Sequence, residues 1–303
     1  MKSELKYRGV VVPMVTPVTA TGDLDEPAVD RLVDFLLAGG VDGIFVVGTT
    51  GEGASIPRPV RRRLVDRTVA RVRRRTVVYA GIGDGQPDEI AAGNDYLGAG
   101  VDAIVVRPPI SFSQERLLSW FEQVLGALRG PVILYNIPST THVSIPLDVI
   151  ARLSENPKLV GVKDSENNAA RHEELLRRFS GRESFSVLIG VGALMGPGLK
   201  MGADGIVPSA GNLIPDVCRR VCEGARRGDW AGMDRYCDRM SEVTALYQKG
   251  RTLGESLAAL KAAMACRGLC APDVLPPLRT LSKAEVESIR SEMARLHLLD
   301  ETP

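Results

Sequence analysis

The chain has 303 residues, of which 44% are hydrophobic and 25% are charged, an ordinary composition for a globular protein with a large core. Its formal net charge is +1, which leaves no overall electrostatic field to attract nucleic acid or an acidic membrane surface. No apolar run reaches the roughly 18 residues of a membrane-spanning helix, and the charged start does not resemble a signal peptide, so we expect a cytoplasmic protein that binds neither nucleic acid nor a membrane.

Short apolar runs rich in β-branched residues recur along the first two thirds of the chain. They are continuous rather than alternating, which is typical of parallel strands with both faces buried. Several runs follow a turn that contains glycine and aspartate, as at 39–43 and 98–102, and such turns are typical of the passage from a helix into a buried strand. This pattern predicts eight strands, at residues 9–16, 43–47, 76–82, 103–106, 131–136, 159–163, 185–190 and 205–207.

Amphipathic stretches between these runs, such as 26–37 and 114–128, are predicted to be helices. Eight strand–helix units predict an α/β fold, a (β/α)8 TIM barrel that occupies residues 1–212 and carries the active site. The alternative is an open doubly wound sheet, but its usual glycine-rich fingerprint does not follow the first predicted strand. Residues 213–303 are predicted to form a C-terminal helical extension packed on the barrel, with helices at 216–227, 230–248, 253–266 and 283–298.

Two groups of residues have simple structural explanations. Nine arginines between Arg58 and Arg75 share a helical stretch with regularly spaced apolar residues and no aromatic ones, which favours a solvated helix face over a nucleic-acid site. The chain has three histidines, too few to complete zinc sites with the cysteines, so we expect no metal site. We expect small buried residues on helix faces instead, with pairs spaced four apart; the cysteines are Cys218, Cys222, Cys237, Cys266 and Cys270.

In a barrel of this type, the reactive groups lie at the C-terminal ends of the strands. Lys163 ends the sixth predicted strand, Tyr135 lies at the end of the fifth, and the turn GTTGE at 48–52 follows the second. An amine that loses its solvation among apolar neighbours becomes a nucleophile that can form a Schiff base with a ketone. A tyrosine hydroxyl can move protons beside it, and the hydroxyl and backbone N–H groups of the turn can hold a carboxylate.

Each of these features also has a purely structural explanation. Lys163 could pair with Asp164 or another acid at a strand end, and Tyr135 could be a core ring with a satisfied hydroxyl. Residues 48–52 could form only a tight turn. Their joint placement at three strand ends favours a catalytic site.

Four motifs identify a family resemblance: GTTGE at 48–52, YNIPSTT at 135–141, GVKDS at 161–165 and GADGIV at 202–207. Over nearly its whole length, the chain resembles the dihydrodipicolinate synthase and N-acetylneuraminate lyase superfamily of class I, pyruvate-type aldolases. The resemblance implies that Lys163 is the Schiff-base lysine, that Tyr135 shuttles protons and that Thr50 relays to Tyr135. It also implies a homotetramer, a dimer of dimers. The implied substrate-binding residues are Gly48, Thr49, Thr50, Gly190 and Val207.

The chain departs from the family's pattern in three places. Dihydrodipicolinate synthases have, at the position of Thr140, an arginine that holds the carboxylate of the aldehyde substrate. They also present a tyrosine to the neighbouring subunit from the loop that corresponds to 107–114, which contains no tyrosine here. Sialic acid lyases place acidic residues after the seventh strand, where 190–195 contain none. These departures weigh against lysine biosynthesis and leave a long polyol substrate without its usual partners.

Three charged or titratable residues have two interpretations each. Arg107 ends the fourth predicted strand and Asp84 follows the third, so the two could pair, which is the interpretation that we favour. Alternatively, Arg107 faces the pocket and binds a second carboxylate, in place of the arginine missing at Thr140. His142 could be a further acid or base, although a loop residue is the simpler interpretation.

The sequence therefore predicts a lyase that needs no cofactor and no metal. It would form a Schiff base with a small-molecule 2-keto acid and would cleave or form a carbon–carbon bond between pyruvate and an aldehyde. Dehydration of a 2-keto-3-deoxy acid through the same enamine is one alternative. Synthesis of 4-hydroxy-tetrahydrodipicolinate is another, disfavoured by Thr140 and the missing loop tyrosine. A third is a protein that binds a keto acid without turning it over.

Overall fold

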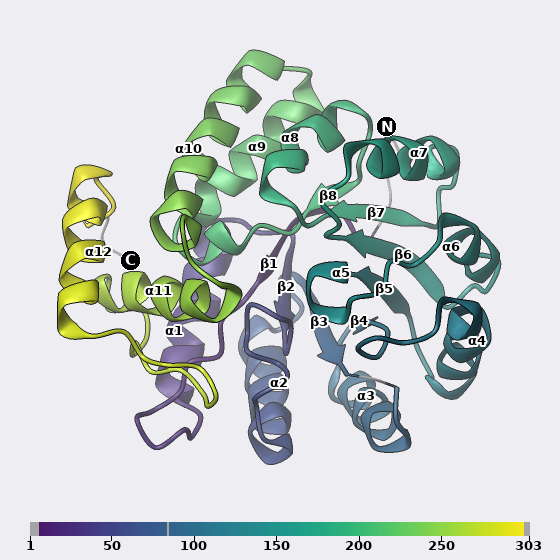
Figure 1. Cartoon of the computed structure of the whole chain (residues 1–303), viewed down its shortest axis with the longest axis horizontal. Coiled ribbons are helices and arrows are strands. Elements are labelled where there is room, and N and C mark those ends of the chain that lie inside the picture. Colours follow the sequence, from purple (N-terminus) through teal and green to yellow (C-terminus); the bar gives the residue numbers. More distant parts are fainter. Residues whose placement is uncertain (1–5, 84, 300–303) are drawn as a thin grey trace.

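The computed structural model describes residues 6–83 and 85–299. Its strands form one parallel sheet that closes on itself where β1 pairs with β8, and helices surround the sheet (Figure 1). The predicted (β/α)8 barrel is confirmed, and each predicted apolar run matches one strand, although β6 continues one residue past its run to Asp164. The strands are β1 (Gly9–Pro13), β2 (Gly43–Val46), β3 (Val77–Ile82), β4 (Ala103–Val106), β5 (Val132–Asn136), β6 (Leu159–Asp164), β7 (Ser186–Ile189) and β8 (Gly205–Ile206).

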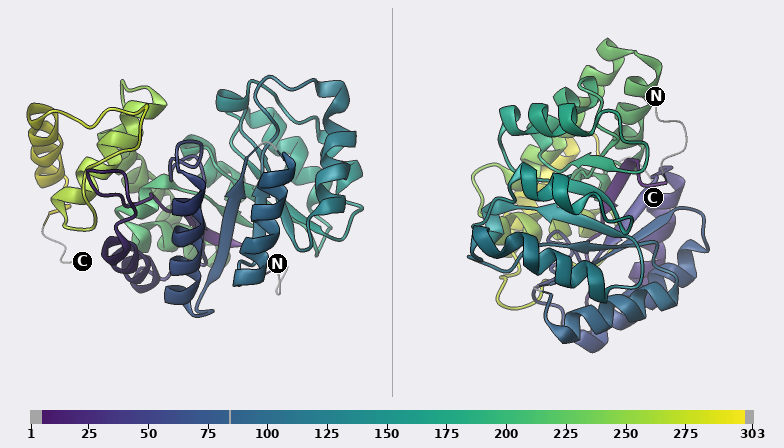
Figure 2. Two further views of the ribbon diagram at one scale, coloured as in Figure 1. Left: turned by 90° about the horizontal axis from the view of Figure 1, so that it is seen from below. Right: turned by 90° about the vertical axis from the view of Figure 1, so that its right-hand side faces the viewer.

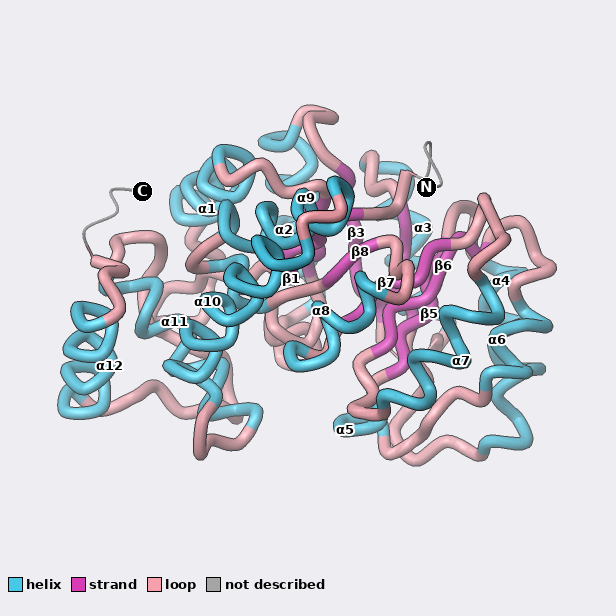
Figure 3. The backbone as a smooth tube through the Cα atoms, turned by 90° about the horizontal axis from the view of Figure 1, so that it is seen from above, coloured by secondary structure: helices cyan, strands magenta, loops and turns pink. Residues whose placement is uncertain are grey.

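Helices that follow the strands form an outer ring, which Figure 3 shows around the sheet. Local signals explain some of their starts: the Asp25 side chain accepts a hydrogen bond from the Ala28 N–H and caps α1, and Asn168 caps α7. The ring consists of α1 (Glu26–Ala38), α2 (Arg58–Val72), α3 (Pro87–Ala99), η1 (Gln114–Arg116), α4 (Leu117–Ala127), α5 (Pro138–Thr141), α6 (Leu147–Leu153), α7 (Ala169–Phe179), α8 (Gly192–Lys200), η2 (Ser209–Asn212) and α9 (Pro215–Arg227).

The described residues after α9 form further helices, as predicted, with a non-helical segment at 267–282. Helix α10 (Trp230–Gln248) packs on α8 and α9, and α11 (Leu253–Cys266) packs on α10 and on α12 (Lys283–Arg295). Figure 2 shows the last of these segments, coloured yellow, at one side of the barrel. Helix α9 itself packs on β1. The expected boundary between barrel and extension, after residue 212, stays a prediction.

Alternate residues of the strands point into the barrel and out toward the helices. At the N-terminal end of the strands, the rings of Tyr7 and Tyr79 meet edge to face with centroids 5.9 Å apart, and the Tyr7 hydroxyl donates to Asp102 O. The barrel is therefore filled at that end, and open space lies at the other. The buried interior cluster consists of Tyr7, Val11, Phe45, Tyr79, Ala103, Val105, Ile133, Tyr135, Ile137, Leu188 and Val207.

The arginine-rich helix α2 lies against an acidic face of α1. Three of its arginines form a ladder of ion pairs with carboxylates one helical turn apart, and these side chains are partly exposed to solvent. The predicted helix face therefore has charge partners within the fold, although such surface pairs contribute little stability each. The pairs are Arg63–Glu26, Arg67–Asp30 and Arg71–Asp34.

The cysteines are free thiols, and three of them, Cys218, Cys222 and Cys270, are buried. Burial raises the pKa of the Cys222 thiol to about 12. The prediction that residues 266 and 270 share a helix face is wrong, because α11 ends at Cys266. In the described part of the chain, no three His, Cys, Asp or Glu side chains come together to hold a metal ion. None of the described helices is both long enough and apolar enough to cross a bilayer.

Candidate active site

Lys163 lies inside the barrel near the C-terminal end of β6, and its side chain is buried. Its Nζ atom is 3.9 Å from the centroid of the Tyr135 ring and 5.1 Å from that of Phe45. Lys163 and Tyr135 are direct partners in the pairing of β5 with β6, and the Phe45 ring stands edge-on to Tyr135. Among the described residues, no carboxylate forms an ion pair with Lys163, and Asp164 bonds elsewhere. The alternative of a Lys163–Asp164 pair is therefore wrong.

A glycine at position 190 leaves room for the lysine. A Cβ atom there would overlap Ser165 Oγ and would lie 3.1 Å from Lys163 Cε. The Gly190 N–H donates to Asp164 O at 2.7 Å, which holds the end of β7 against β6. Val207, at the end of β8, belongs to the same interior cluster as Tyr135. Of the two predicted backbone positions, Gly190 thus lies beside Lys163, and Val207 lies in the interior cluster that contains Tyr135.

The turn at 48–52 is anchored to the loop that follows β1. Thr16 donates from Oγ1 to Gly51 O at 2.6 Å, and both residues are buried. Within the turn, the Glu52 N–H donates to Thr49 O at 3.1 Å. Thr49 and Thr50 are half-buried, so their hydroxyl groups are not sealed in the core. The turn is thus a fixed element that leaves polar groups accessible.

A cavity of about 650 Å³ opens at the C-terminal ends of the strands. The barrel contributes polar groups to it, including the predicted residues Gly48, Thr49, Arg107, Tyr135 and Thr140. Apolar side chains on its other side come from α11 and the segment after it, namely Leu253, Leu257 and Leu278. Phe45 and Tyr135 both line the cavity, so the rings that contact the Lys163 amine also face the space where a substrate could bind.

Three predicted roles lack a supporting contact. No hydrogen bond joins Thr50 to Tyr135 among the described residues, so the relay stays a prediction. The Arg107 guanidinium donates to Pro108 O at 3.4 Å, but the predicted pairing with Asp84 lies outside the described residues. His142 is exposed at the end of α5, with a φ of 57°, and does not line the cavity. It is the loop residue that the simpler interpretation predicted.

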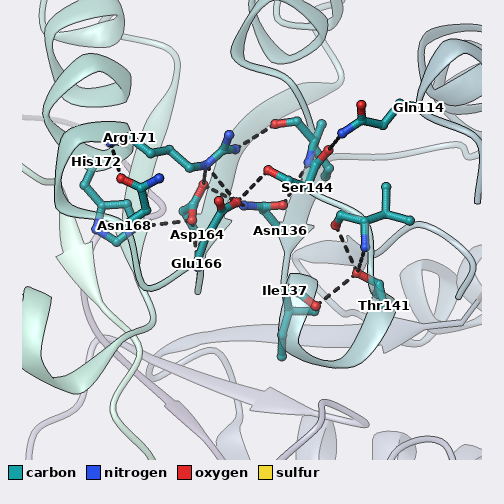
Figure 4. Close-up of polar contacts among 12 residues, drawn as sticks. Gln114, Asn136, Ile137, Thr141, Ser144, Asp164, Glu166, Asn168, Arg171 and His172 are labelled. Carbon is teal, nitrogen blue, oxygen red and sulfur yellow. Dashed lines mark hydrogen bonds and ion pairs between the residues drawn. The ribbon is translucent and has the colours of Figure 1, made fainter. Parts of the chain in front are cut away.

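Directly behind the lysine and tyrosine, on the outer face of β5 and β6, lies a buried polar network (Figure 4). Asp164 is fully buried and accepts hydrogen bonds from Asn136 Nδ2 at 3.1 Å, Arg171 Nε at 2.9 Å and His172 Nε2 at 3.2 Å. Glu166 extends the network, because its carboxylate accepts from Asn136 and, at 2.6 Å, from the Ser144 hydroxyl. These contacts join α7 and the loop after β5 to the strands that carry Lys163 and Tyr135.

The charge of Asp164 is stabilised where it lies. Burial opposes its ionisation, but hydrogen bonds from His172 and the guanidinium of Arg171 outweigh that effect and hold the pKa of the carboxyl below its ordinary value. Asp164 is therefore a carboxylate at neutral pH, and it accepts a hydrogen bond from His172 Nε2–H. The other ring nitrogen, Nδ1, is buried without a hydrogen-bond partner among the described residues.

Comparison with known proteins assigns the family. The dihydrodipicolinate synthetase family matches residues 6–295. The chain belongs to this family. It is 32% identical over 290 residues to the 4-hydroxy-tetrahydrodipicolinate synthase of Phenylobacterium zucineum, a match that covers 95% of this chain and 96% of that protein. The resemblance inferred from the four motifs is confirmed, and the chain is an enzyme of the lyase and aldolase class.

Solved structures of the dihydrodipicolinate synthetase family share the fold. Dihydrodipicolinate synthase from Bacteroides thetaiotaomicron superimposes with a TM-score of 0.91 at 29% identity, over 96% of this chain and 99% of that one. YagE of Escherichia coli K12, whose structure was solved with pyruvate, superimposes with a TM-score of 0.89 at 28% identity, over the same shares. YagE is provisionally named a 2-dehydro-3-deoxy-D-gluconate aldolase.

Sequence reasoning missed three parts of this family member's site. Phe45 was assigned only to a strand, although its ring lies beside the Lys163 amine. The network around Asp164 was missed as well, although an acid directly after a strand-end lysine must point to the opposite face. The third missed residue is Lys261, which is fully buried in α11. Its signal was its isolation as a charged residue among apolar ones, in the sequence AALKAAMA at residues 258–265.

Proposed function

We propose that the protein is a class I lyase in which Lys163 forms a Schiff base with a 2-keto acid, and that it forms or cleaves a carbon–carbon bond between pyruvate and an aldehyde. The observation that carries the proposal is the position of the Lys163 amine. It is buried 3.9 Å from the centroid of the Tyr135 ring, and it has no ion-pair partner among the described residues. Tyr135, together with Thr49, lines the cavity.

In the proposed cleavage, the neutral amine of Lys163 attacks the keto carbon of the substrate and water leaves, which gives an iminium ion. The iminium nitrogen accepts the electron pair of the breaking carbon–carbon bond as the neighbouring hydroxyl loses its proton, so an aldehyde departs and an enamine remains. The enamine takes up a proton on carbon, and water then hydrolyses the iminium to release pyruvate. We assign the supply and uptake of these protons to Tyr135, because the centroid of its ring lies 3.9 Å from the amine.

The carboxylate of the keto acid is assigned to the turn at 48–52. Gly48 and Thr49 line the cavity, so a hydroxyl and backbone N–H groups of the turn face the space in which an anion could bind. Thr50, the next residue, is half-buried, and we assign its hydroxyl to the same carboxylate. We assign the relay between Thr50 and Tyr135 to the substrate-bound state. Gly190 and Val207 shape the space around the Schiff base rather than contribute a reactive group.

We assign a second carboxylate, on the aldehyde partner, to Arg107. It lines the same cavity as Thr140, so a cation is present although position 140 carries a hydroxyl. This arrangement makes an anionic aldehyde the favoured substrate class, and it keeps 4-hydroxy-tetrahydrodipicolinate synthesis as the second candidate. Removing a hydrogen bond to a charged group costs roughly 10- to 100-fold. Arg107→Ala should therefore lower kcat/KM by that factor for an aldehyde with a carboxylate and leave it almost unchanged for a neutral one, whereas equal losses for both would refute the assignment.

We also propose a homotetramer. The rim of the cavity carries the exposed apolar side chains of Ile110 and Leu253, which are 62% and 50% exposed in the single chain. A second copy that covered this rim would remove them from water and would supply groups that the loop at 107–114 lacks. Sedimentation equilibrium of the wild type and of Ile110→Asp tests this: a monomeric wild type would refute it, and a weakened assembly in the variant would support it.

The test of the proposed chemistry is borohydride trapping with pyruvate, followed by intact mass and peptide mapping. We expect one pyruvyl adduct on Lys163, absent from Lys163→Ala and retained in Lys158→Ala, which removes a structural lysine instead. Exchange of the pyruvate methyl protons with deuterated water then separates an enzyme from a protein that only binds keto acids, because only enamine formation exchanges them. No adduct with pyruvate or with larger 2-keto acids would refute the proposal.

A further inference from the structure

A buried ion pair joins the turn at 48–52 to the C-terminal helices. Lys261 Nζ in α11 lies 2.6 Å from Glu52 Oε1, and both side chains are 1% exposed. Two backbone groups complete the arrangement: the Leu275 N–H donates to Glu52 Oε2 at 2.6 Å, and Lys261 Nζ donates to Asp273 O at 2.6 Å. The last residue of the candidate carboxylate-binding turn is thus held by a segment more than 200 residues away in sequence.

Stability alone does not account for this pair. Two charges lose their hydration when they are buried, and a well-packed apolar pair of similar volume is usually at least as stable. A charged pair whose two side chains are each also bonded to the backbone, here Glu52 Oε2 by the Leu275 N–H and Lys261 Nζ to Asp273 O, fixes distance and direction, which an apolar contact does less well. Glu52 Oε1 contacts Lys261 as an ion pair, without a hydrogen bond among the described residues. The pair therefore fits a requirement for precise placement of the turn.

The geometry of Glu52 shows what is being placed. Its φ of 59° lies in the left-handed region, which is uncommon for a residue other than glycine. In this conformation its N–H donates to Thr49 O, which closes the turn around the two threonines. Thr16 holds the neighbouring carbonyl of Gly51 from the opposite side. The turn is thus fixed from β1's loop and from α11 at once.

We infer that Lys261 is a positioning residue for the keto-acid site, and that through it the C-terminal helices are part of the active site. Through Glu52, Lys261 holds the hydroxyls and N–H groups at 48–50 where they bind the substrate carboxylate. The inference rests on the proposed function, since it assumes that a keto acid binds there. Helix α11 also lines the cavity with Leu253, Gly254 and Leu257, so the same helix shapes the cavity and fixes the turn.

The test compares Lys261→Met with the double variant Glu52→Gln/Lys261→Met, which removes both charges and keeps both volumes. The rate of borohydride trapping is measured against pyruvate concentration. Misplacement of a binding group by about 1 Å typically costs on the order of 100-fold, so we expect the half-saturating concentration to rise roughly 10- to 100-fold. The plateau rate should change less than about 3-fold, because Lys163 and Tyr135 stay in place. A purely structural role would not separate these two quantities.

The matched control is Lys158→Met. Lys158 is half-buried, and like Lys261 it donates to the backbone, to Leu125 O at 2.9 Å and to Leu128 O at 2.7 Å. Unlike α11, it does not line the cavity. It should leave the half-saturating concentration unchanged. The double variant leaves no charge unpaired, so it keeps the test available if Lys261→Met does not fold; circular dichroism and the Tm check folding.

Two results would overturn the inference: a folded double variant that saturates at the wild-type pyruvate concentration, or one whose plateau rate falls while half-saturation is unchanged. A wild-type protein that traps no keto acid at all would refute the proposed function, and this inference with it. That outcome is distinct, because it is seen before any variant is made.

Discussion

Replacement of Arg171 by methionine would test the buried network behind the catalytic strands. In the wild type, Arg171 Nε donates to Asp164 at 2.9 Å, and a terminal nitrogen of its guanidinium donates to Ile145 O at 2.8 Å. The side chains of Arg171 and Asp164 are 9% and 0% exposed, so water cannot replace the lost bonds. Methionine keeps most of the apolar stem and removes the charge, so the variant isolates the loss of the guanidinium.

The expected loss of stability follows from burial and from the partners that remain. Removing one member of a buried ion pair typically costs about 3–5 kcal/mol, because the other charge stays buried. Asp164 still accepts hydrogen bonds from Asn136, His172 and the Glu166 N–H, so the lower end, about 3 kcal/mol, is expected. In a chain of this size each kcal/mol lowers the Tm by about 2 °C, so calorimetry should show a decrease of about 6 °C near neutral pH.

The pH dependence gives a second, independent readout. The pKa of Asp164 is lowered in the folded protein: burial opposes ionisation, but the hydrogen bonds from His172 and the Arg171 charge outweigh it. The stability that this carboxylate contributes is therefore complete above its unfolded pKa of about 3.9 and is lost as the pH falls through the folded pKa. Without Arg171 the folded pKa moves upward. The variant should then lose stability on acidification at a higher pH than the wild type does.

Arg177→Met is the matched control, because Arg177 is on the same helix but is 71% exposed and pairs with Glu174 at 2.8 Å on the surface. It should change the free energy of unfolding by no more than about 0.5 kcal/mol. If Arg171→Met had the Tm of this control and the acid transition of the wild type, the network would not stabilise the strand ends. Slower trapping of Lys163 in a folded Arg171→Met protein would extend its effect to the site.

Two further substitutions probe the site from its other sides. Gly190→Ala places a methyl group against Ser165 Oγ and 3.1 Å from Lys163 Cε. Trapping of Lys163 with pyruvate should therefore slow at least about 10-fold in a folded variant. A folded variant with the wild-type trapping rate would contradict this steric argument. Thr16→Val removes the hydrogen bond to Gly51 O, so the free energy of unfolding measured by urea titration should fall by about 1 kcal/mol. The pyruvate concentration that half-saturates trapping should rise. A variant unchanged in both quantities would show that the loop after β1 does not hold the turn.

The sequence was sufficient to predict the elements whose signals are local. A continuous apolar run between turn residues marks each buried parallel strand, and the residue that ends such a run in a barrel must lie near the mouth. Lys163, Tyr135 and the turn at 48–52 were therefore predictable as neighbours before any contact was known. The helices at 230–248 and 253–266 were also predicted with their observed ends. In the structure a capping aspartate precedes the first and a capping box precedes the second, so both starts have local causes.

The sequence was not sufficient where partners come from distant parts of the chain. Glu52 and Lys261 meet only because the C-terminal helices fold back over the barrel, and no periodicity links them. The sequence did contain a signal, because Lys261 is the one charged residue between Glu255 and Arg267. A single charge on a helix with apolar residues on every side requires a buried partner. The identity of that partner required the tertiary structure.

The network around Asp164 also specifies the register on which the site depends. Tyr135 pairs with Lys163, and Asn136 pairs with Asp164, on opposite faces of the same two strands. A slip of one residue would turn Asp164 toward Phe45 inside the barrel and would point Lys163 at α7. Apolar residues alone penalise such a slip weakly in β6. The register shifts at Val160, which is skipped in the pairing with β5, so Val160 packs with the interior cluster and Val162 with the outer one, and both are apolar. A carboxylate that finds its donors only on the outer face distinguishes the two faces of β6, and so keeps the lysine amine beside Tyr135.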